Sequence, residues 1–217
     1  MNSSVDALTF GANGNLHAGG VFTNAGGVAA NYVAVWNGTS WTNLGAGMNS
    51  AVSALAPDAN GNLFPGGPYT YAGGLAANYV AVWNGSSWTN VGAGMSNAVY
   101  ALDRDANGNL YAGGNFTTAG GVAANRMAVW NGSSWTNLGA GMNGSVNALV
   151  IDTNGNLYAG GGFSVAGSVM ANNVARWSLL APPPPTVDND GGATGITGNS
   201  AVLRGEIFST GPPTNKA

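Results

Sequence analysis

The 217-residue sequence contains no cysteine, one histidine and few charged residues. Asp, Glu, Lys and Arg make up 6% of it, against about 25% in an ordinary soluble domain. Without cysteine there can be no disulfide, no thiolate metal ligand and no cysteine nucleophile. Five Lys and Arg and a net charge of −3 cannot supply the series of phosphate contacts on which nucleic-acid affinity rests. We therefore expect no nucleic-acid partner.

Long apolar runs are missing as well. The sequence has no continuous apolar stretch of about 18 residues, the length that indicates a membrane-spanning helix, and no charged leader followed by an apolar segment. We therefore predict no membrane span and find no signal peptide in this chain. The hydrophobic fraction of 45% is still sufficient for a packed core, which excludes disorder of the highly charged kind.

What the sequence has instead is an internal repeat with a period of 47 residues, the first feature to look for in such a chain. Each unit keeps a valine, a leucine, a glycine and a tryptophan in constant register. These positions are Val5, Val52, Val99 and Val146; Leu16, Leu63, Leu110 and Leu157; Gly19, Gly66, Gly113 and Gly160; and Trp36, Trp83, Trp130 and Trp177. A second tryptophan follows at Trp41, Trp88 and Trp135.

Within one unit, short apolar segments alternate with turn residues, which is typical of strands rather than helices. Residues 105–109 read D-A-N-G-N, a hairpin signal, because Asn and Gly both tolerate positive φ. The unit predicts four antiparallel strands, with a longer Gly, Ala and Asn connection between the second and the third. In the third unit they are expected at 99–103, 110–116, 126–130 and 135–139.

Residues 80–83, V-A-V-W, are apolar on both faces of their strand, as expected of a sheet that is covered on both sides. The glycine pair in each second strand allows another backbone to approach closely. A period of 47 residues also lies within the range of propeller blades, about 40 to 50 residues. The sequence therefore predicts an all-β protein, a β-propeller of four-stranded antiparallel blades. Four repeats are present, and the fourth lacks its outer strand, which leaves fifteen strands.

Three motifs of the third unit resemble known repeats. They are N-G-N-L-Y-A-G-G-x-F (Asn107 to Phe116), A-G-G (Ala119 to Gly121) and V-W-N-G-S-S-W-T-N-L-G-A-G-M (Val129 to Met142). The unit resembles the propeller repeats of bacterial surface proteins, is similar to the repeat of the fungal cortical polarity-marker family, and more loosely resembles kelch repeats. The resemblance covers residues 1–180. It implies an extracellular or cell-surface location and carries no catalytic residue.

Both ends of the repeat array predict a fragment of a longer chain. Met1 falls in register with Met48 and Met142, so the chain begins within a unit. Residues 181–192 include four successive prolines and predict an extended linker, and residues 193–217 resemble the opening strands of a fibronectin type III-like domain. We expect residues 201–208 to fill the edge left by the missing strand, or chains to associate through that edge.

Few residues of this sequence can carry chemistry. The turns that begin at Asp58, Asp105 and Asp152 differ from a calcium loop in the place of their glycine and in the missing distal Glu, so we interpret them as hairpin turns. His17 stands where the second unit has Phe64 and is interpreted as a packed ring. One histidine, one glutamate and no cysteine cannot assemble a nucleophile with its base or a carboxylate pair. We predict no enzyme, no cofactor and no metal site.

The tryptophans and one variable position are the candidates for binding. We interpret the first tryptophan of each unit as a core residue, because its strand is apolar on both faces. The second begins the outermost strand, where it either stabilises the blade or stacks on sugar rings at repeated sites. The residue after the asparagine that ends the long connection differs between units, and it is expected on the long-loop face. The candidate binding residues are therefore Tyr32, Tyr79, Arg126, Trp41, Trp88 and Trp135.

Two functions remain open at this point. The first is a non-catalytic scaffold or protein-interaction propeller of a secreted or cell-surface protein. The second is a carbohydrate-binding, lectin-like propeller, so that the partner at the long-loop face is a protein or a glycan.

One unit departs from the others in its second strand. Pro65 and Pro68 lie in that strand, and proline cannot donate a hydrogen bond to a ladder. We therefore expect the strand pairing of this blade to be interrupted between Leu63 and Tyr69.

Overall fold

The computed structural model describes residues 1–179 and contains strands, turns and loops in them. Within these residues, three sheets have four antiparallel strands, one has three and four small hairpins have two, so the predicted fold class and, for this part of the chain, the fifteen blade strands are confirmed. The first blade has β1 (Val5–Phe10), β2 (Leu16–Gly20), β5 (Val33–Trp36) and β6 (Trp41–Asn43). The second has β7 (Ala54–Pro57), β8 (Leu63–Gly66), β11 (Ala81–Trp83) and β12 (Trp88–Asn90). The third has β13 (Val99–Arg104), β14 (Leu110–Gly114), β17 (Met127–Trp130) and β18 (Trp135–Asn137). The fourth has β19 (Val146–Ile151), β20 (Asn156–Gly161) and β23 (Val174–Ser178).

The expected linker at 181–192 and the fibronectin-like segment at 193–217 lie outside the described residues. The same holds for the expected docking of residues 201–208.

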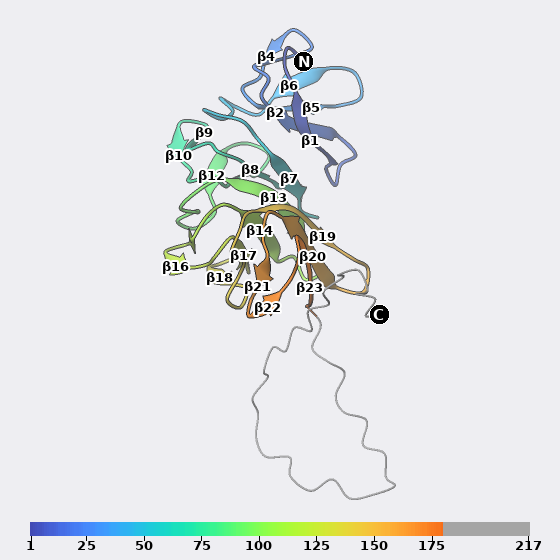
Figure 1. The fold of residues 1–217 in the computed structure, drawn as a ribbon. Coiled ribbons are helices and arrows are strands. Elements are labelled where there is room, and N and C mark those ends of the chain that lie inside the picture. The colour runs from blue at the N-terminus through green and yellow to red at the C-terminus, as the bar shows by residue number, and fades with distance from the viewer. Residues whose placement is uncertain (180–217) are drawn as a thin grey trace, which may run out of the picture.

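The blades stand side by side in a curved row, with the first and the fourth at opposite ends (Figure 1). The first strands of successive blades, β1, β7, β13 and β19, contact one another in chain order. The hydrophobic core lies in the seams between blades. One cluster, for example, joins Phe64 and Val80 of the second blade to Val99 and Leu110 of the third. A blade therefore buries its apolar faces against its neighbours, as repeat architectures do.

A small hairpin interrupts the connection between the second and third strands of every blade, and the sequence did not reveal it. In the second blade, Gly73 and Gly74 turn the chain at φ values of 59° and 85°, which side chains rarely adopt. The hairpins are β3 (Asn24–Ala25) with β4 (Val28–Ala29), β9 (Tyr71–Ala72) with β10 (Leu75–Ala76), β15 (Thr118–Ala119) with β16 (Val122–Ala123), and β21 (Val165–Ala166) with β22 (Val169–Met170).

The hairpins bind the segments that connect one blade to the next through backbone bridges and hydrogen bonds. Met48, in the segment after the first blade, forms a bridge with Ala72 of β9. The side-chain oxygen of Asn49 accepts hydrogen bonds from the backbone N–H groups of Thr70 and Tyr71, at 2.9 and 3.0 Å. The long connection and the blade-to-blade connection therefore lie on one side of the molecule, as predicted, and we call that side the hairpin face.

Each seam is closed by a valine that packs on a glycine of the preceding blade. A Cβ atom added at Gly66 would lie 2.6 Å from Cγ1 of Val99, and one added at Gly113 would lie 2.5 Å from Cγ1 of Val146. Real Cβ contacts are never this short, so only glycine fits at these positions. The first glycine of each pair therefore serves the close approach of blades that the sequence predicted, whereas the second, as at Gly67 and Gly114, lies against the backbone of its own blade.

The predicted interruption of the second blade is confirmed on one side of β8. This strand keeps four aligned pairs with β7, including Leu55 with Pro65. Its pairing with β11 is reduced to Leu63 with Trp83 and a bridge between Gly66 and Val80. The corresponding strands of the third blade keep four successive pairs, so the break follows from the missing N–H of Pro65.

Candidate functional site

Two pockets open at successive seams, and their linings are related by the 47-residue repeat. The first, of about 270 Å³, lies between the first and second blades. The second, of about 420 Å³, lies between the second and third blades. We call them the seam pockets. Side chains that line the first include His17, Asn43, Leu44, Pro57 and Trp83. Those at the same repeat positions in the second are Phe64, Asn90, Val91, Arg104 and Trp130.

Trp83 and Trp130 form one wall of the seam pockets. Both are half-buried, and the six-membered ring of each lies beside a glycine of the preceding blade, Gly45 or Gly92. This tryptophan packs against the core at both seams, as predicted, but its ring is only half-buried there. Trp36 of the first blade is also half-buried. Within the described residues the fourth-blade Trp177, at 9% exposure, is the member of this set that is buried.

Trp88 and Trp135 are the buried members of the tryptophan pairs, each 4% exposed. Trp88 Nε1–H donates across the first seam to the backbone oxygen of Leu44 at 2.7 Å, and Trp135 does the same to Val91 at 2.8 Å. Of the two roles left open for these residues, their burial favours the structural one. Trp41, the third residue of the set, is half-buried.

The Asp58 turn borders the second seam pocket, but the carboxylates of the aspartate turns accept hydrogen bonds from residues of their own turns. In the second blade, Asp58 Oδ1 accepts hydrogen bonds from the backbone N–H groups of Asn60 and Asn62, and its Oδ2 accepts one from the Asn62 side chain. Hydrogen bonds from the Asn156 side chain and backbone likewise hold the pKa of Asp152 below its ordinary value of 3.8. These contacts support the interpretation as hairpin turns. Within residues 1–179, no group of three or more His, Asp or Glu residues is placed to hold a metal ion.

His17 lines the first seam pocket. Its Nδ1 is buried without a hydrogen-bond partner among the described residues, and burial lowers its pKa below the ordinary value of 6.5. A Cβ atom at Gly11 would lie 2.7 Å from His17 Cε1, so the glycine that replaces the aspartate of the other units makes room for this ring. In the third blade the corresponding Tyr111 instead donates its hydroxyl to Asp105 at 3.2 Å.

Arg104 is a residue of the second seam pocket that sequence reasoning missed. Its guanidinium carbon lies 4.8 Å from the centroid of the Phe64 ring, and Nη2 donates to the backbone oxygen of Gly108. Nη1 is buried, with no partner among the described residues. The sequence does contain a signal, because the equivalent positions hold Phe10, Pro57 and Ile151, but it does not show that Phe64 lies beside this arginine.

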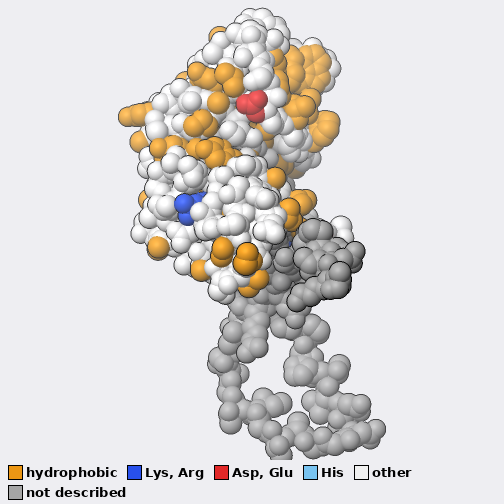
Figure 2. Space-filling view, in the orientation of Figure 1, with side chains coloured by type: hydrophobic (Ala, Val, Ile, Leu, Met, Phe, Trp, Pro, Cys, Tyr) orange, Lys and Arg blue, Asp and Glu red, His pale blue; other side chains and the backbone are white. Residues whose placement is uncertain are grey.

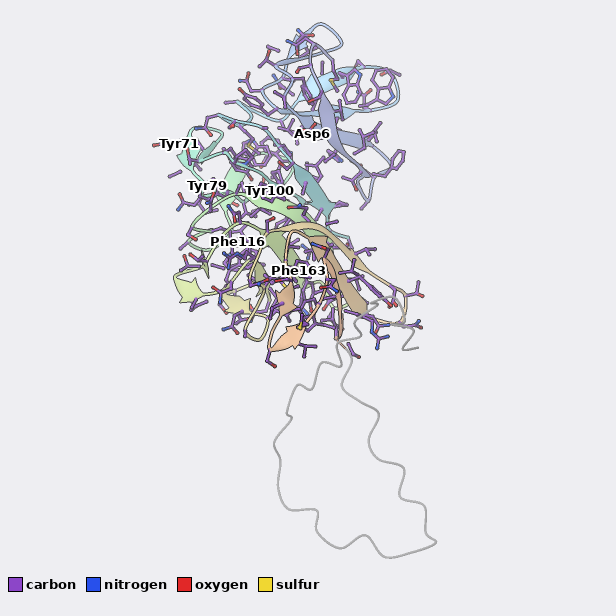
Figure 3. All side chains as sticks on the ribbon, viewed as in Figure 1. Asp6, Tyr71, Tyr79, Tyr100, Phe116 and Phe163 are labelled. Carbon is purple, nitrogen blue, oxygen red and sulfur yellow. The ribbon has the colours of Figure 1, made fainter. Side chains whose placement is uncertain are left out.

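The variable residues Tyr32, Tyr79 and Arg126 lie away from the seam pockets, towards the hairpin face. All three are half-buried and have positive φ, between 63° and 68°, a conformation that is uncommon for residues other than glycine. Arg126 Nη1 donates to the backbone oxygen of Met142 at 3.1 Å. Figure 3 shows Tyr79 on the same side as Tyr71 of the β9–β10 hairpin. The structure therefore does not gather the six predicted binding residues into one site.

The face of the molecule drawn in Figure 2 carries few charged groups. Figure 2 shows a face covered by uncharged polar and hydrophobic side chains, with charged groups in isolated spots. In the part of the chain that the structure describes, no helix has the length and apolar character needed to cross a membrane.

Fold and pockets together define the class of protein, a propeller-like repeat domain with equivalent pockets at successive seams. No protein-family model matches the chain, and no curated protein matches it. The fold is similar to that of the extracellular domain of the putative hybrid two-component system BT4673 from B. thetaiotaomicron. That match has a TM-score of 0.54 and 13% identity over 81% of this chain and 20% of the other.

A second structure, described as the extracellular domain of the putative one-component system BT4673 from B. thetaiotaomicron, matches with the same TM-score and identity. It covers 86% of this chain and 22% of the other. The chain thus spans about a fifth of the length of the structures it resembles.

Proposed function

We propose that this chain is a non-catalytic binding propeller, a scaffold or interaction module of a secreted or cell-surface protein. The observation that carries the proposal is the repetition of one pocket at successive seams. A repeated pocket serves binding, because equivalent sites on one rigid row raise avidity without any new contact.

The chemistry of the described residues supports a role without catalysis. The Asp58 carboxylate is occupied by its own turn. Nδ1 of His17 has no hydrogen-bond partner among the described residues that would orient the ring as a base, whereas a catalytic base is held by a second group. Neither residue is in position to activate a nucleophile.

The surface location is supported by the two similar structures, both described as extracellular domains. It is tested by labelling intact and permeabilised cells of the source organism with an antibody against residues 1–179. We expect labelling of intact cells, or recovery of the protein from the medium. Labelling that requires permeabilisation, with none in the medium, would overturn the location.

A carbohydrate is the ligand that the seam pockets favour. Each pocket places a tryptophan ring beside asparagine side chains, Trp83 near Asn43 and Trp130 near Asn90. An aromatic face accepts the apolar C–H side of a sugar ring, and amides both donate to and accept from its hydroxyls. Ligand pockets combine an apolar lining with a few polar groups in this way. The first seam pocket has no Asp, Glu, Lys or Arg in its lining, which suits an uncharged sugar, whereas Asp58 and Arg104 both line the second.

The test is a glycan array probed with the 217-residue chain, followed by titration of the best glycan. Trp83→Ala with Trp130→Ala removes one wall of each seam pocket and should reduce binding at least about tenfold, corresponding to about 1.4 kcal/mol. Trp36→Ala is the matched control, since Trp36 has the same repeat position but lines neither pocket. Binding lost equally in the control, or no glycan bound, would refute the carbohydrate ligand.

A further inference from the structure

Arg104 is the residue that distinguishes the second seam pocket from the first. The equivalent residue of the first pocket is Pro57, and among the described residues no Asp, Glu, Lys or Arg lines that pocket. Both walls of the second pocket come from inner blades, with Phe64 in the second blade and Arg104 in the third. Each of these blades has four strands and contacts a described blade on either side. The lining therefore does not depend on either end of the chain.

The Arg104 guanidinium is held in place by two contacts. Its carbon lies 4.8 Å from the centroid of the Phe64 ring, a cation–π geometry, and Nη2 donates to the backbone oxygen of Gly108. Nη1 is buried and has no hydrogen-bond partner among the described residues, although a guanidinium carries several N–H donors. A ligand in this pocket thus meets a positioned charge, and a positioned group loses less entropy when it binds.

The carboxylates that flank Arg104 in the sequence, and the one in its pocket, accept hydrogen bonds from other groups. Asp103 accepts one from the backbone N–H of Ile151, in the next blade, at 2.7 Å. Asp105 Oδ1 accepts from backbone N–H groups of its own turn at 2.8 and 2.9 Å, and Asp58 is held in the same way. Within residues 1–179, Arg104 forms no ion pair. Its charge is therefore available to an anionic group of a ligand.

We propose that the second seam pocket selects a sugar that carries a carboxylate, such as a hexuronic acid, and that Arg104 binds this carboxylate. The inference rests on the proposed function, carbohydrate binding at the seam pockets. Arginine binds a carboxylate through two parallel N–H···O hydrogen bonds, which fix the direction of the ligand as well as adding affinity. The half-buried ring of Trp130 and the amide of Asn90 lie in the same lining and contact the rest of the sugar.

Asp58, in the same lining, sets the orientation of the ligand. Like charges repel, so the carboxylate of the sugar lies beside Arg104 and its hydroxyls lie beside Asp58. A hexuronic acid suits both residues, because each ring has one carboxylate among several hydroxyls. An acidic peptide has carboxylates but no ring of hydroxyls for Asp58 and Asn90. The volume of about 420 Å³ lies within the range of small-ligand pockets.

The test is calorimetric titration of the 217-residue chain with oligosaccharides of glucuronic, galacturonic and mannuronic acid. Each is compared with its neutral counterpart, in which the carboxyl groups have been reduced to alcohols. We expect at least one acidic oligosaccharide to bind about tenfold or more tightly than its counterpart, the scale of a charge-assisted pair. Higher ionic strength should weaken binding of the acidic ligand and leave the neutral one unchanged, because salt screens charges.

Variants of the arginines assign the preference to one residue. Arg104→Gln should lower the affinity for the acidic ligand to that of its neutral counterpart. Arg104→Lys should restore only part of the difference, because lysine lacks the planar fork of donors. Arg126→Asn is the matched control, since it removes the same charge outside both seam pockets and copies Asn173 of the fourth blade. Circular dichroism shows whether each variant folds, and Arg104→Ile, which copies Ile151, replaces Arg104→Gln if the latter unfolds.

The two pocket tryptophans assign the preference to one pocket. Trp130→Ala should abolish the preference for the acidic ligand, whereas Trp83→Ala, at the first pocket, should leave it unchanged. Neutral sugars that bind without any preference for their acidic forms would overturn this inference and leave carbohydrate binding intact. A preference that survives Arg104→Gln would also overturn it, as would a polyglutamate peptide that binds as tightly as the acidic sugar. A chain that binds no sugar, acidic or neutral, would refute the proposed function as well.

Discussion

Two tryptophan rings lie close together in each complete blade, and in the second and third blades they differ in burial. In the second blade, Trp83 and Trp88 are paired across β11 and β12, with ring centroids 5.2 Å apart. Trp88 is buried and hydrogen-bonded across the seam, whereas Trp83 is half-buried at the pocket. Its burial and its indole N–H hydrogen bond thus indicate that Trp88 stabilises the fold, whereas the partly exposed ring of Trp83 is available to a ligand.

Trp88→Ala should lower the free energy of unfolding by about 3 to 5 kcal/mol, the usual range for a buried aromatic residue. Trp83→Ala should cost clearly less, because part of that ring is already in solvent. Denaturant titration of the two variants measures the difference. Trp88→Phe separates the contribution of packing from that of the hydrogen bond, since it keeps most of the packing and removes the hydrogen bond to Leu44. Equal losses for Trp83→Ala and Trp88→Ala would contradict the assignment.

His17 should make the stability of the chain sensitive to pH. Its pKa is lowered in the folded state because burial disfavours the charged ring. The unfolded state therefore binds the proton more readily, and stability falls as the pH drops below about 6.5. Melting curves on both sides of that pH should show the loss. His17→Phe, which copies the second blade, should remove this part of the pH dependence, and an unchanged dependence in the variant would count against it.

At the scale of elements, the second blade shows how a broken ladder is repaired. Pro65 supplies no N–H to β11, yet Tyr69 donates its hydroxyl to the backbone oxygen of Pro65 at 2.6 Å. The same hydroxyl is hydrogen-bonded to the backbone of Ala81, which belongs to β11. The other three blades have phenylalanine at the position of Tyr69. The extra hydroxyl therefore replaces contacts that proline removes from this ladder.

Tyr69→Phe should therefore destabilise the chain by about 1 to 3 kcal/mol, because it leaves buried backbone groups without their partner. Chemical denaturation measures this loss. Hydrogen exchange should also show faster opening of β8 in the variant. Phe116→Tyr is the reverse control, and it should not stabilise the third blade, where the ladder is complete. A Tyr69→Phe variant as stable as the parent would show that the hydroxyl is not needed.

At the scale of the whole molecule, the seams connect the blades into one unit. Repeat proteins derive stability from the interfaces between neighbours as well as from each repeat. Here the glycine positions determine how closely blades approach, and the same substitution meets different surroundings along the row. Gly113 is covered by Val146, whereas within residues 1–179 no side chain of a following blade covers Gly160.

Gly113→Ala should destabilise the chain by about 1 to 3 kcal/mol, the usual cost of overpacking a tight core. Gly160→Ala should be neutral or stabilising by up to about 1 kcal/mol, because its Cβ meets no atom of the described residues closer than 3.9 Å and alanine restricts the unfolded chain. Chemical denaturation of the two variants and the parent measures both free energies. Equal destabilisation by the two substitutions would contradict the difference between the two sites.

The sequence by itself determined the repeat, the blade strands and the aspartate turns. These depend on short-range rules, namely the alternation of side chains along a strand and the φ preferences of Asn and Gly. The break at Pro65 was predictable for the same reason, since proline removes a donor wherever it stands. The hairpins were not predictable, because strands of two residues are too short to show a period.

Only the tertiary structure decided which tryptophan is buried and where the pockets lie. Trp88 is buried because Leu44 lies across the seam, 44 positions earlier in the sequence. Arg104 enters a pocket because Phe64, in another blade, lies beneath it. The position that varies between Tyr79, Arg126 and Asn173 has an unusual backbone conformation and lies away from the pockets. The repeat specifies each blade from local sequence, but burial and pocket shape arise where one blade meets the next.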